Sequence, residues 1–405
     1  MLHPILYATL NLTRNCNLAC SYCFNWGKGK GRMNLDTGKR SIDFLLRNAR
    51  EADEISLRGK GRQVELQFWG GEPLIEWPLL KDLVHYAKKA SKEIPVRFGG
   101  TTNGTLFTPD KFTFLKENQI HFVISFDGTP QSHDTHRRFR NGGGSHATIA
   151  RNIEAGLKIF PGLRVRMSPF AEGIDRFYED VAYIIALGIR QLMFSPVYES
   201  GWTAERWQTF DAQCQQVTDL LLAQRGKGDP VEIEHYKSYA KSDSSHWPCG
   251  AGRTFVGIDV DGSIYPCHRF IKFNDARPWH LRPTSIGHID FGITNPEFRK
   301  SFIDRRPTKC NTCGYDKITP CHGGCYAVNY DLTGHIATPP EVLCRSVEIQ
   351  STISRSYREK FGPKGFPEAV HVPPTKPSAS GIMAVVKQME ARISALDKVL
   401  SHDAN

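Results

Sequence analysis

The chain has 405 residues, of which 40% are hydrophobic and 23% are charged, with a formal net charge of +10. This length allows two or three domains with a buried core, and no apolar run approaches the roughly 18 residues that span a bilayer. The N-terminal segment 1–14 lacks the pattern of a secretory signal peptide. We therefore expect a globular, cytoplasmic protein.

The positive charge permits an anionic partner, such as nucleic acid or an acidic peptide, but does not select one. Basic residues are scattered over segments 27–32, 58–62 and 137–140, and no aromatic-rich surface for single strands accompanies them. We expect these segments to face solvent or substrate rather than nucleic acid.

From residue 7 to about 196, short apolar runs alternate with amphipathic stretches, which is typical of a parallel sheet built from βα units. Strands are predicted at 7–12, 64–69, 96–101, 121–126, 163–168 and 190–195, and helices near 35–51, 78–91, 109–118, 147–159 and 175–187. Six strands are too few for a closed eight-stranded barrel. The fold class is therefore α/β, with a partial, TIM-like (β/α)6 barrel.

The rest of the chain is predicted to form a bridge, a cysteine-rich region and a tail. A helix is expected at about 203–225, and the segment 362–381 is rich in Pro, Gly and Ser, as in a linker. Helix periodicity returns after it. The predicted division is a barrel at 5–200, a helical bridge at 201–246, a small cysteine-rich domain at 247–346, and a tail with a C-terminal helix at 347–405.

Functional residues are expected at the carboxyl ends of the predicted strands, because the connecting loops converge there. Those ends read CNLACSYCF, GGEPL, TTNGT, SFDG and MSPF, in chain order. In GGEPL, the glycines let a ligand approach the backbone and Glu72 can accept a hydrogen bond from an ammonium group. A plain turn is the alternative for GGEPL and for Asn103 in TTNGT.

The eleven cysteines are unevenly distributed, which in a reducing compartment indicates metal ligation rather than disulfides. Cys214 stands alone in a helical run and is expected to be a buried thiol. The first group has only three cysteines, Cys16, Cys20 and Cys23, whereas zinc and most iron–sulfur sites take four ligands. Three thiolates on an iron–sulfur cube leave one iron free to hold a chelating ligand.

The spacing of these three cysteines, with Tyr22 directly before the third, resembles that of radical S-adenosylmethionine (SAM) enzymes. The resemblance implies a 4Fe-4S cluster whose free iron binds SAM and whose electron cleaves it to a 5′-deoxyadenosyl radical. It also implies a low-potential electron donor such as flavodoxin or ferredoxin. The implied cofactor-binding residues are Gly70, Gly71, Glu72 and Pro73 near the methionine amino group, Ser125, Asp127 and Arg137 near the carboxylate and ribose, and Asn103.

The seven later cysteines resemble the SPASM extension of radical SAM enzymes that modify peptides and proteins. By this resemblance, one auxiliary 4Fe-4S cluster is held by Cys310, Cys313, Cys321 and Cys344, and a second by Cys249, Cys267 and Cys325, which makes three clusters in all. Seven residues separate Cys313 from Cys321 where the common pattern has five. Structural zinc is the alternative for these paired cysteines.

The second auxiliary cluster is one thiolate short, because Phe255 stands where sulfatase-maturating relatives have a further cysteine. Water, another side chain or a substrate thiolate can supply the missing ligand. Those relatives also carry Asp directly after the cysteine that matches Cys267, whereas this chain has His268. His268 can act as a catalytic base, and an ordinary hydrogen-bonded histidine is the alternative.

The resemblance implies a precursor peptide as substrate, and we expect an oxidative carbon–carbon, ether or thioether crosslink in it. The departures at Phe255 and His268 argue against the alternative of formylglycine formation in a sulfatase. A radical dehydrogenase or epimerase of a small molecule is another alternative, and a zinc-dependent nucleic-acid-binding protein is an alternative from a different class. No leader-binding domain is expected before the first strand.

Replacement of Cys16, Cys20 and Cys23 by Ala is expected to abolish 5′-deoxyadenosine formation, because the cluster would lose all its protein ligands. Anaerobic liquid chromatography of the products of SAM cleavage measures this. Retained formation in the triple variant would contradict the radical SAM interpretation.

Overall fold

The computed structural model describes residues 3–24, 31–52, 62–234, 249–273, 277–303, 310, 313, 321 and 323–361. The predicted Pro-rich linker and C-terminal helix lie outside the described residues.

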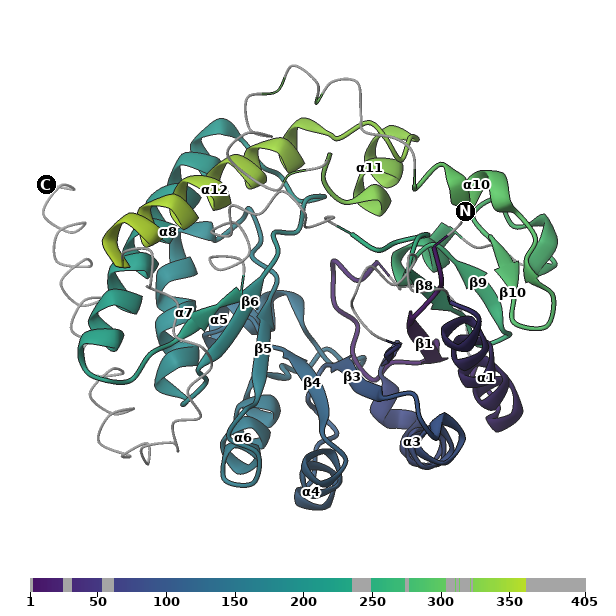
Figure 1. Cartoon of the computed structure of the whole chain (residues 1–405). Coiled ribbons are helices and arrows are strands. Elements are labelled where there is room, and N and C mark those ends of the chain that lie inside the picture. Colours follow the sequence, from purple (N-terminus) through teal and green to yellow (C-terminus); the bar gives the residue numbers. More distant parts are fainter. Residues whose placement is uncertain are drawn as a thin grey trace, which may run out of the picture.

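Six parallel strands form an open, curved sheet, which confirms the predicted partial barrel (Figure 1). They are β1 (Tyr7–Thr13), β2 (Val64–Gly70), β3 (Val96–Thr102), β4 (Ile120–Ser125), β5 (Arg164–Met167) and β6 (Gln191–Phe194). Each pairs in parallel with the next in chain order. Each boundary lies within one residue of the predicted one: β1, β2 and β3 extend one residue further, β4 is shifted back by one residue, and β5 and β6 are one residue shorter at each end.

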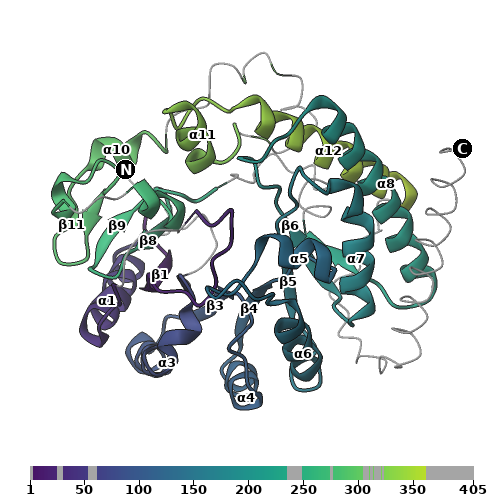
Figure 2. The ribbon, with the colours of Figure 1, turned by 180° about the vertical axis from the view of Figure 1, so that it is seen from behind.

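Helices cover the outer side of this arc of strands, as both views show (Figures 1 and 2). They are α1 (Leu35–Glu51), α3 (Trp77–Ser91), α4 (Pro109–Glu117), α6 (His146–Leu157), α7 (Phe177–Ala186) and α8 (Ala204–Gly226). Helix α5 (Pro130–His136) lies at the carboxyl ends of the strands, and there are two 3₁₀ turns, η1 (Pro73–Glu76) and η2 (Ile174–Arg176). Short polar side chains begin several of them; Asn34, for example, accepts from the amide of Thr37 at 2.7 Å. The short helix α5 was not predicted.

The strands present two different faces because side chains alternate along a strand. In β2, Val64, Leu66 and Phe68 are buried in the core beneath the helices. Gln67 and Trp69 alternate with them and are only half-buried. The inner, concave side of the arc is therefore the more polar and open one.

The cysteine-rich region continues the barrel sheet instead of forming a sheet of its own. Strand β8 (Phe255–Ile258) pairs in parallel with β1, and β9 (Ser263–Tyr265), β10 (Gly287–His288) and β11 (Gly292–Ile293) follow in antiparallel order. A two-residue strand, β7 (Glu232–Ile233), extends the other edge at β6. The sequence did not reveal this continuity, because β8–β11 are too short to carry a clear pattern.

Four short helical segments and one long helix follow in the described part of the cysteine-rich region: η3 (His268–Phe273), η4 (Trp279–Leu281), α10 (Pro296–Lys300), α11 (Tyr326–Thr333) and the long helix α12 (Glu341–Phe361). Helix α12 lies beside α8, and Lys360 pairs with Asp219 at 2.9 Å. Within the described ranges, no helix combines the length and the apolar character needed to cross a bilayer.

A buried carboxylate joins the barrel to the cysteine-rich region. Asp259 follows β8, is fully buried, and accepts hydrogen bonds from Asn11 Nδ2 at 2.7 Å and Arg14 Nη2 at 2.5 Å. Both partners lie at the carboxyl end of β1. The contact therefore fixes the loop that leads from β1 to the first cysteines.

We expect Asp259→Ala to lower the free energy of unfolding by about 3 kcal/mol, because it removes the buried carboxylate that Asn11 and Arg14 share. Denaturant unfolding of the metal-free protein, followed by circular dichroism, measures this. Asp36→Ala is the control, since Asp36 pairs with Arg40 while largely exposed, and its effect should stay below about 1 kcal/mol. Equal effects of the two substitutions would contradict the prediction.

Candidate active site

The loop after β1 brings Cys16, Cys20 and Cys23 together as half-buried thiols. In a tight turn, the amide of Cys23 donates a hydrogen bond to the carbonyl oxygen of Cys20 at 3.1 Å. Burial, together with the charges of Glu72 and the other two cysteines, raises the pKa of the Cys16 thiol to about 12. A nucleophilic cysteine needs a lowered pKa, whereas a metal ion deprotonates the thiol that binds it. The environment therefore fits metal ligation better than nucleophilic catalysis.

The predicted glycine pair holds the start of this loop. The amide of Gly71 donates to Thr13 O at 2.7 Å. Added side chains would collide with the loop, since a Cβ on Gly70 would lie 2.3 Å from Thr13 O and one on Gly71 would lie 2.2 Å from Asn15 O. Gly70 also has a φ of 149°, which favours glycine. The close approach of β2 to the cysteine loop therefore requires glycine at both positions.

Glu72 is fully buried behind the loop and connects two of the predicted motifs. Its carboxylate accepts from the amide of Leu74 at 3.0 Å, the hydroxyl of Thr102 at 2.7 Å and the amide of Asn103 at 2.7 Å. Burial raises its pKa to about 7, although these hydrogen bonds oppose the shift. Pro73 begins η1 directly after it. In this structure Glu72 thus orders the TTNGT turn.

Asn103 reaches from this turn to the cysteine loop. Its amide nitrogen donates to Asn17 Oδ1 at 2.8 Å and lies 3.7 Å from the sulfur of Cys16. The side-chain oxygen accepts from the amide of Thr105 at 3.0 Å. Asn103 therefore makes the contact typical of a turn asparagine and also lies beside a candidate metal ligand, so its role toward a cofactor stays a prediction.

Asp127 and Arg137 form a buried ion pair with Nε–Oδ2 at 2.6 Å. Asp127 also accepts from the hydroxyl of Tyr22 at 2.7 Å and from the amide of Ser168 at 2.7 Å. Burial opposes the charge of Asp127, but Arg137 keeps the pKa of this carboxyl below its usual value. Ser125 ends β4 two residues earlier. The pair thus joins the cysteine loop to the ends of β4 and β5.

Tyr22 and Ser168 were not predicted as partners of Asp127. Tyr22 was noted only for its place beside Cys23, and the guanidinium of Arg137 lies 5.1 Å from the centre of its ring. The MSPF turn that contains Ser168 was identified as a strand end, but nothing in the sequence shows which loop it meets.

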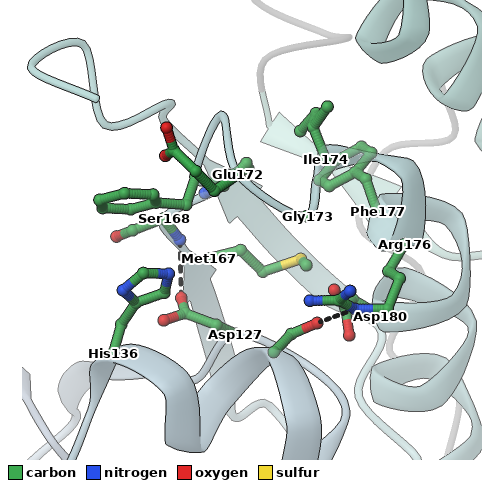
Figure 3. A pocket seen from close by; sticks show the side chains of 13 residues that line it. Asp127, His136, Met167, Ser168, Glu172, Gly173, Ile174, Arg176, Phe177 and Asp180 are labelled. Atoms are coloured by element: carbon green, nitrogen blue, oxygen red, sulfur yellow. Dashed lines mark hydrogen bonds between the residues drawn. The ribbon is translucent and has the colours of Figure 1, made fainter. Parts of the chain in front are cut away.

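A small, open pocket lies beside Asp127 at the ends of β4 and β5 (Figure 3). His136 and Phe170 stack at 4.0 Å on its wall, and Phe170 also contacts Tyr22 of the cysteine loop. Asp180 lines the far side, and burial raises its pKa to about 7. The pocket is therefore bounded by both polar and aromatic groups close to the first three cysteines.

Cys249, Cys267 and Cys325 come together from distant parts of the sequence, next to an apolar cluster that contains Phe255. Burial raises the pKa of Cys249 to about 11, and the charge of Cys325 adds to the shift. Burial and the other two thiols also raise the pKa of Cys267. The structure thus groups the three cysteines of one predicted auxiliary cluster.

The aromatic ring of Phe255 stacks on Tyr7 of β1 at 4.3 Å. It lies beside this cysteine group, so an apolar side chain stands where relatives were expected to have a fourth thiolate. The identity of a fourth ligand stays open.

The other cysteines of the predicted pair of clusters are Cys310, Cys313, Cys321 and Cys344. Cys310 is buried, and its carbonyl accepts from the amide of Cys313 at 3.3 Å. Cys344 lies within α12. Most residues between Cys310 and Cys321 lie outside the described ranges, so this ligand set stays a prediction.

Among the described residues, no three Cys, His, Asp or Glu side chains are arranged to hold a single metal ion. Sulfurs on one tetrahedral zinc ion would lie about 3.8 Å apart. An iron–sulfur cube is larger than one ion and separates its thiolates further. The surroundings of the paired cysteines Cys310, Cys313 and Cys321 lie largely outside the described residues, so the zinc alternative is not tested there. Cys214 lies in the hydrophobic core, as expected of a structural thiol.

His268 follows Cys267 and stacks on Trp69 with ring centres 4.3 Å apart. Burial and the nearby charges of Arg269 and Arg166 lower its pKa to about 3. Its Nδ1 is buried with no hydrogen-bond partner among the described residues. Such a histidine is neutral and a weak proton acceptor near neutral pH, so its role as a base stays a prediction.

Comparisons with known proteins agree with this arrangement. Residues 10–170 match the Radical SAM superfamily. The chain is 26% identical over 338 residues to a cysteine-type anaerobic sulfatase-maturating enzyme of Clostridium novyi, covering 77% of this chain and 85% of the relative. It is also 26% identical over 347 residues to the PqqA peptide cyclase of Ruegeria pomeroyi, covering 83% and 86%.

A solved structure of histidine-tagged anSMEcpe with bound AdoMet resembles this fold with a TM-score of 0.70. The sequences are 19% identical, and the match covers 88% of this chain and 98% of the other. The similarity extends beyond the first six strands into the cysteine-rich region, which is consistent with a SPASM domain.

Because the Asp127–Arg137 pair is buried, we expect Asp127→Asn and Arg137→Gln to be strongly coupled. A double-mutant cycle on the free energy of unfolding should give a coupling of about 2 kcal/mol, since each single change leaves a charge without its partner. The exposed pair Glu172–Arg206 is the control and should give less than about 1 kcal/mol. A coupling near zero for the buried pair would show that the contact does not stabilise the loop.

Proposed function

Because residues 10–170 of this enzyme form a radical SAM domain and its relatives include peptide and protein maturases, we propose that it crosslinks a ribosomally made precursor peptide. The new bond would be a carbon–carbon, ether or thioether bond. One observation carries the proposal. The loop after β1 holds one group of cysteines, and β8, which pairs with β1 in the same sheet, is flanked by cysteines of a second group.

The cluster and SAM, when bound, supply a 5′-deoxyadenosyl radical that abstracts a hydrogen atom from the substrate. Cys16, Cys20 and Cys23 would hold that cluster. Asn103 would stay beside the Cys16 sulfur, where it donates weakly to the ligand atom. Glu72 would keep the TTNGT turn in place through its three hydrogen bonds.

Gly70, Gly71 and Pro73 would shape the backbone that meets the methionine end of the cofactor. On the opposite side, Asp127 and Arg137 would hold Tyr22, and with it the cysteine loop, in place. Ser125 would lie at the neighbouring strand end. The adjacent pocket would offer aromatic rings, His136 and Phe170, beside Asp127.

An oxidative crosslink removes two hydrogen atoms from the peptide. One leaves in 5′-deoxyadenosine, and the other leaves as a proton and an electron. Cys249, Cys267 and Cys325, with the set of Cys310, Cys313, Cys321 and Cys344, would hold two auxiliary 4Fe-4S clusters able to take that electron. A low-potential donor such as flavodoxin or ferredoxin would supply the electron that starts each cycle.

Formylglycine formation in a sulfatase is a second candidate, favoured by the similarity to the Clostridium novyi enzyme. Phe255 and His268 argue against it, because they replace a cluster ligand and a carboxylate expected in such maturases. Burial lowers the pKa of His268, so this chain offers a neutral imidazole where such maturases are expected to have a charged carboxylate.

The test is anaerobic co-expression with each short open reading frame encoded beside the gene, followed by peptide mass spectrometry. A peptide that loses two hydrogens and no longer fragments between two joined residues is the expected product. The triple Ala variant of Cys16, Cys20 and Cys23 is the control and should give unmodified peptide.

A hydrazide reagent separates the two candidates, because formylglycine carries an aldehyde and a crosslink does not. Labelling of a co-expressed sulfatase would assign formylglycine formation instead. Formation of 5′-deoxyadenosine without any modified peptide would point to a larger protein or a small molecule as substrate.

A further inference from the structure

Arg166 places a cation on the concave side of the sheet. It lies in β5 between Val165 and Met167, both of which are buried in the core beneath the helices. Because side chains alternate along a strand, Arg166 points to the opposite face. It pairs across the sheet with Ser125 at the end of β4, and so it lies at the level of the proposed site.

The guanidinium group of Arg166 forms no hydrogen bond or ion pair with any residue that the structure describes. Its neighbours differ in this respect. Arg137 is paired with Asp127 at 2.6 Å, and Arg269 is paired with Glu199 at 2.9 Å. The nearby carboxylates are therefore already occupied, and the charge of Arg166 is left over.

Two further nitrogen atoms near Arg166 also have no hydrogen-bond partner among the described residues. Arg269 Nε and His268 Nδ1 are buried without a hydrogen-bond partner in the described part of the chain. Arg166 and Arg269 both lower the pKa of His268, and Arg269 lowers that of Arg166, with burial the main cause in each case. All three groups thus lie within electrostatic range of one another.

Aromatic side chains border this cationic group on the barrel side. Trp69 at the end of β2 stacks on His268, and the guanidinium of Arg269 lies 5.2 Å from the centre of the Phe24 ring. Phe24 directly follows Cys23, and His268 directly follows Cys267. Arg269 and His268 therefore lie between the two groups of cysteines, where we expect the substrate of the proposed reaction, and Arg166 is within electrostatic range of both.

A cation without a counterion in a partly buried site costs free energy of desolvation. A guanidinium group suits a carboxylate, because the carboxylate can accept two parallel hydrogen bonds from it. Cluster thiolates are a competing partner for Arg269, because Cys325 and Cys267 raise its pKa. The charges that act on Arg166 come instead from Arg269, Arg137 and two tyrosines. No cysteine is among the main causes of the Arg166 shift, in contrast to Arg269.

We propose that Arg166, assisted by Arg269 and His268, binds a carboxylate of the peptide substrate on the concave face of the barrel. The inference rests on the proposed function, since it takes the substrate to be a peptide. The carboxylate can belong to an Asp or Glu side chain or to the C-terminus of the peptide. It would fix the peptide between the two groups of cysteines.

The test is anaerobic titration calorimetry on the reconstituted enzyme saturated with SAM. The probes are three peptides: Ac-Gly-Glu-Gly-NH2, Ac-Gly-Gln-Gly-NH2 and Ac-Gly-Gln-Gly-OH. We expect at least one carboxylate peptide to bind about tenfold more tightly than the neutral peptide, as expected of a charge-assisted contact. The first and third probes distinguish a side-chain carboxylate from a C-terminal one.

Arg166→Gln should remove this preference, and Arg166→Lys should restore part of it. Arg47→Gln is the matched control, because it removes the same charge from the exposed side of α1, and it should keep the preference. Equal iron content in all variants checks that they fold and bind clusters.

Equal binding of charged and neutral peptides, or no measurable binding up to about 10 mM, would overturn the inference. An unchanged preference in Arg166→Gln would overturn it as well. A loss of SAM affinity in that variant would also overturn it, because it would assign Arg166 to the cofactor's own carboxylate. The binding measurement needs no turnover. A carboxylate preference without any crosslink on co-expression would therefore overturn only the proposed function, and a crosslink without the preference only this inference.

Discussion

The buried ion pair between Asp127 and Arg137 is the contact on which the candidate site depends. Two charges nearly out of reach of water are stable only if each stays matched, so the pair fixes every element that supplies a partner. It receives Tyr22 from the cysteine loop and the amide of Ser168 from the turn after β5. Three loops that are distant in sequence are thereby held at one end of the barrel, where small shifts would separate ligands that must act together.

A second constraint comes from the opposite side of the same loop. The glycine pair after β2 lets the backbone approach Thr13 and Asn15 more closely than any side chain would allow, and the carboxylate of Glu72 then ties this turn to Asn103. The backbone and side chains around Cys16 are thus held in place before any metal binds. Preorganisation of this kind reduces the entropy lost when a cofactor is bound.

The two groups of cysteines are related through β1. One group follows its carboxyl end. In the other group, Cys249 and Cys267 lie on either side of β8, which pairs with β1 in parallel, and Cys325 directly precedes α11. Phe24, Trp69 and His268 contact one another in the space between the groups. A peptide held there would be close to both the proposed source of the radical and the proposed acceptor of the second electron.

The sequence by itself determined the six barrel strands, their helices and the spacing of the cysteines, because hydrophobic periodicity and ligand spacing are local properties of the chain. It did not reveal the extension of the sheet by β8–β11, since strands of two to four residues carry almost no periodicity. Only the tertiary structure decided that Asp127 is occupied by Arg137, that Cys249, Cys267 and Cys325 meet, and that Arg166 is left without a carboxylate among the residues described. These are contacts between residues far apart in the chain, and they depend on how the strands are ordered and packed rather than on any local pattern.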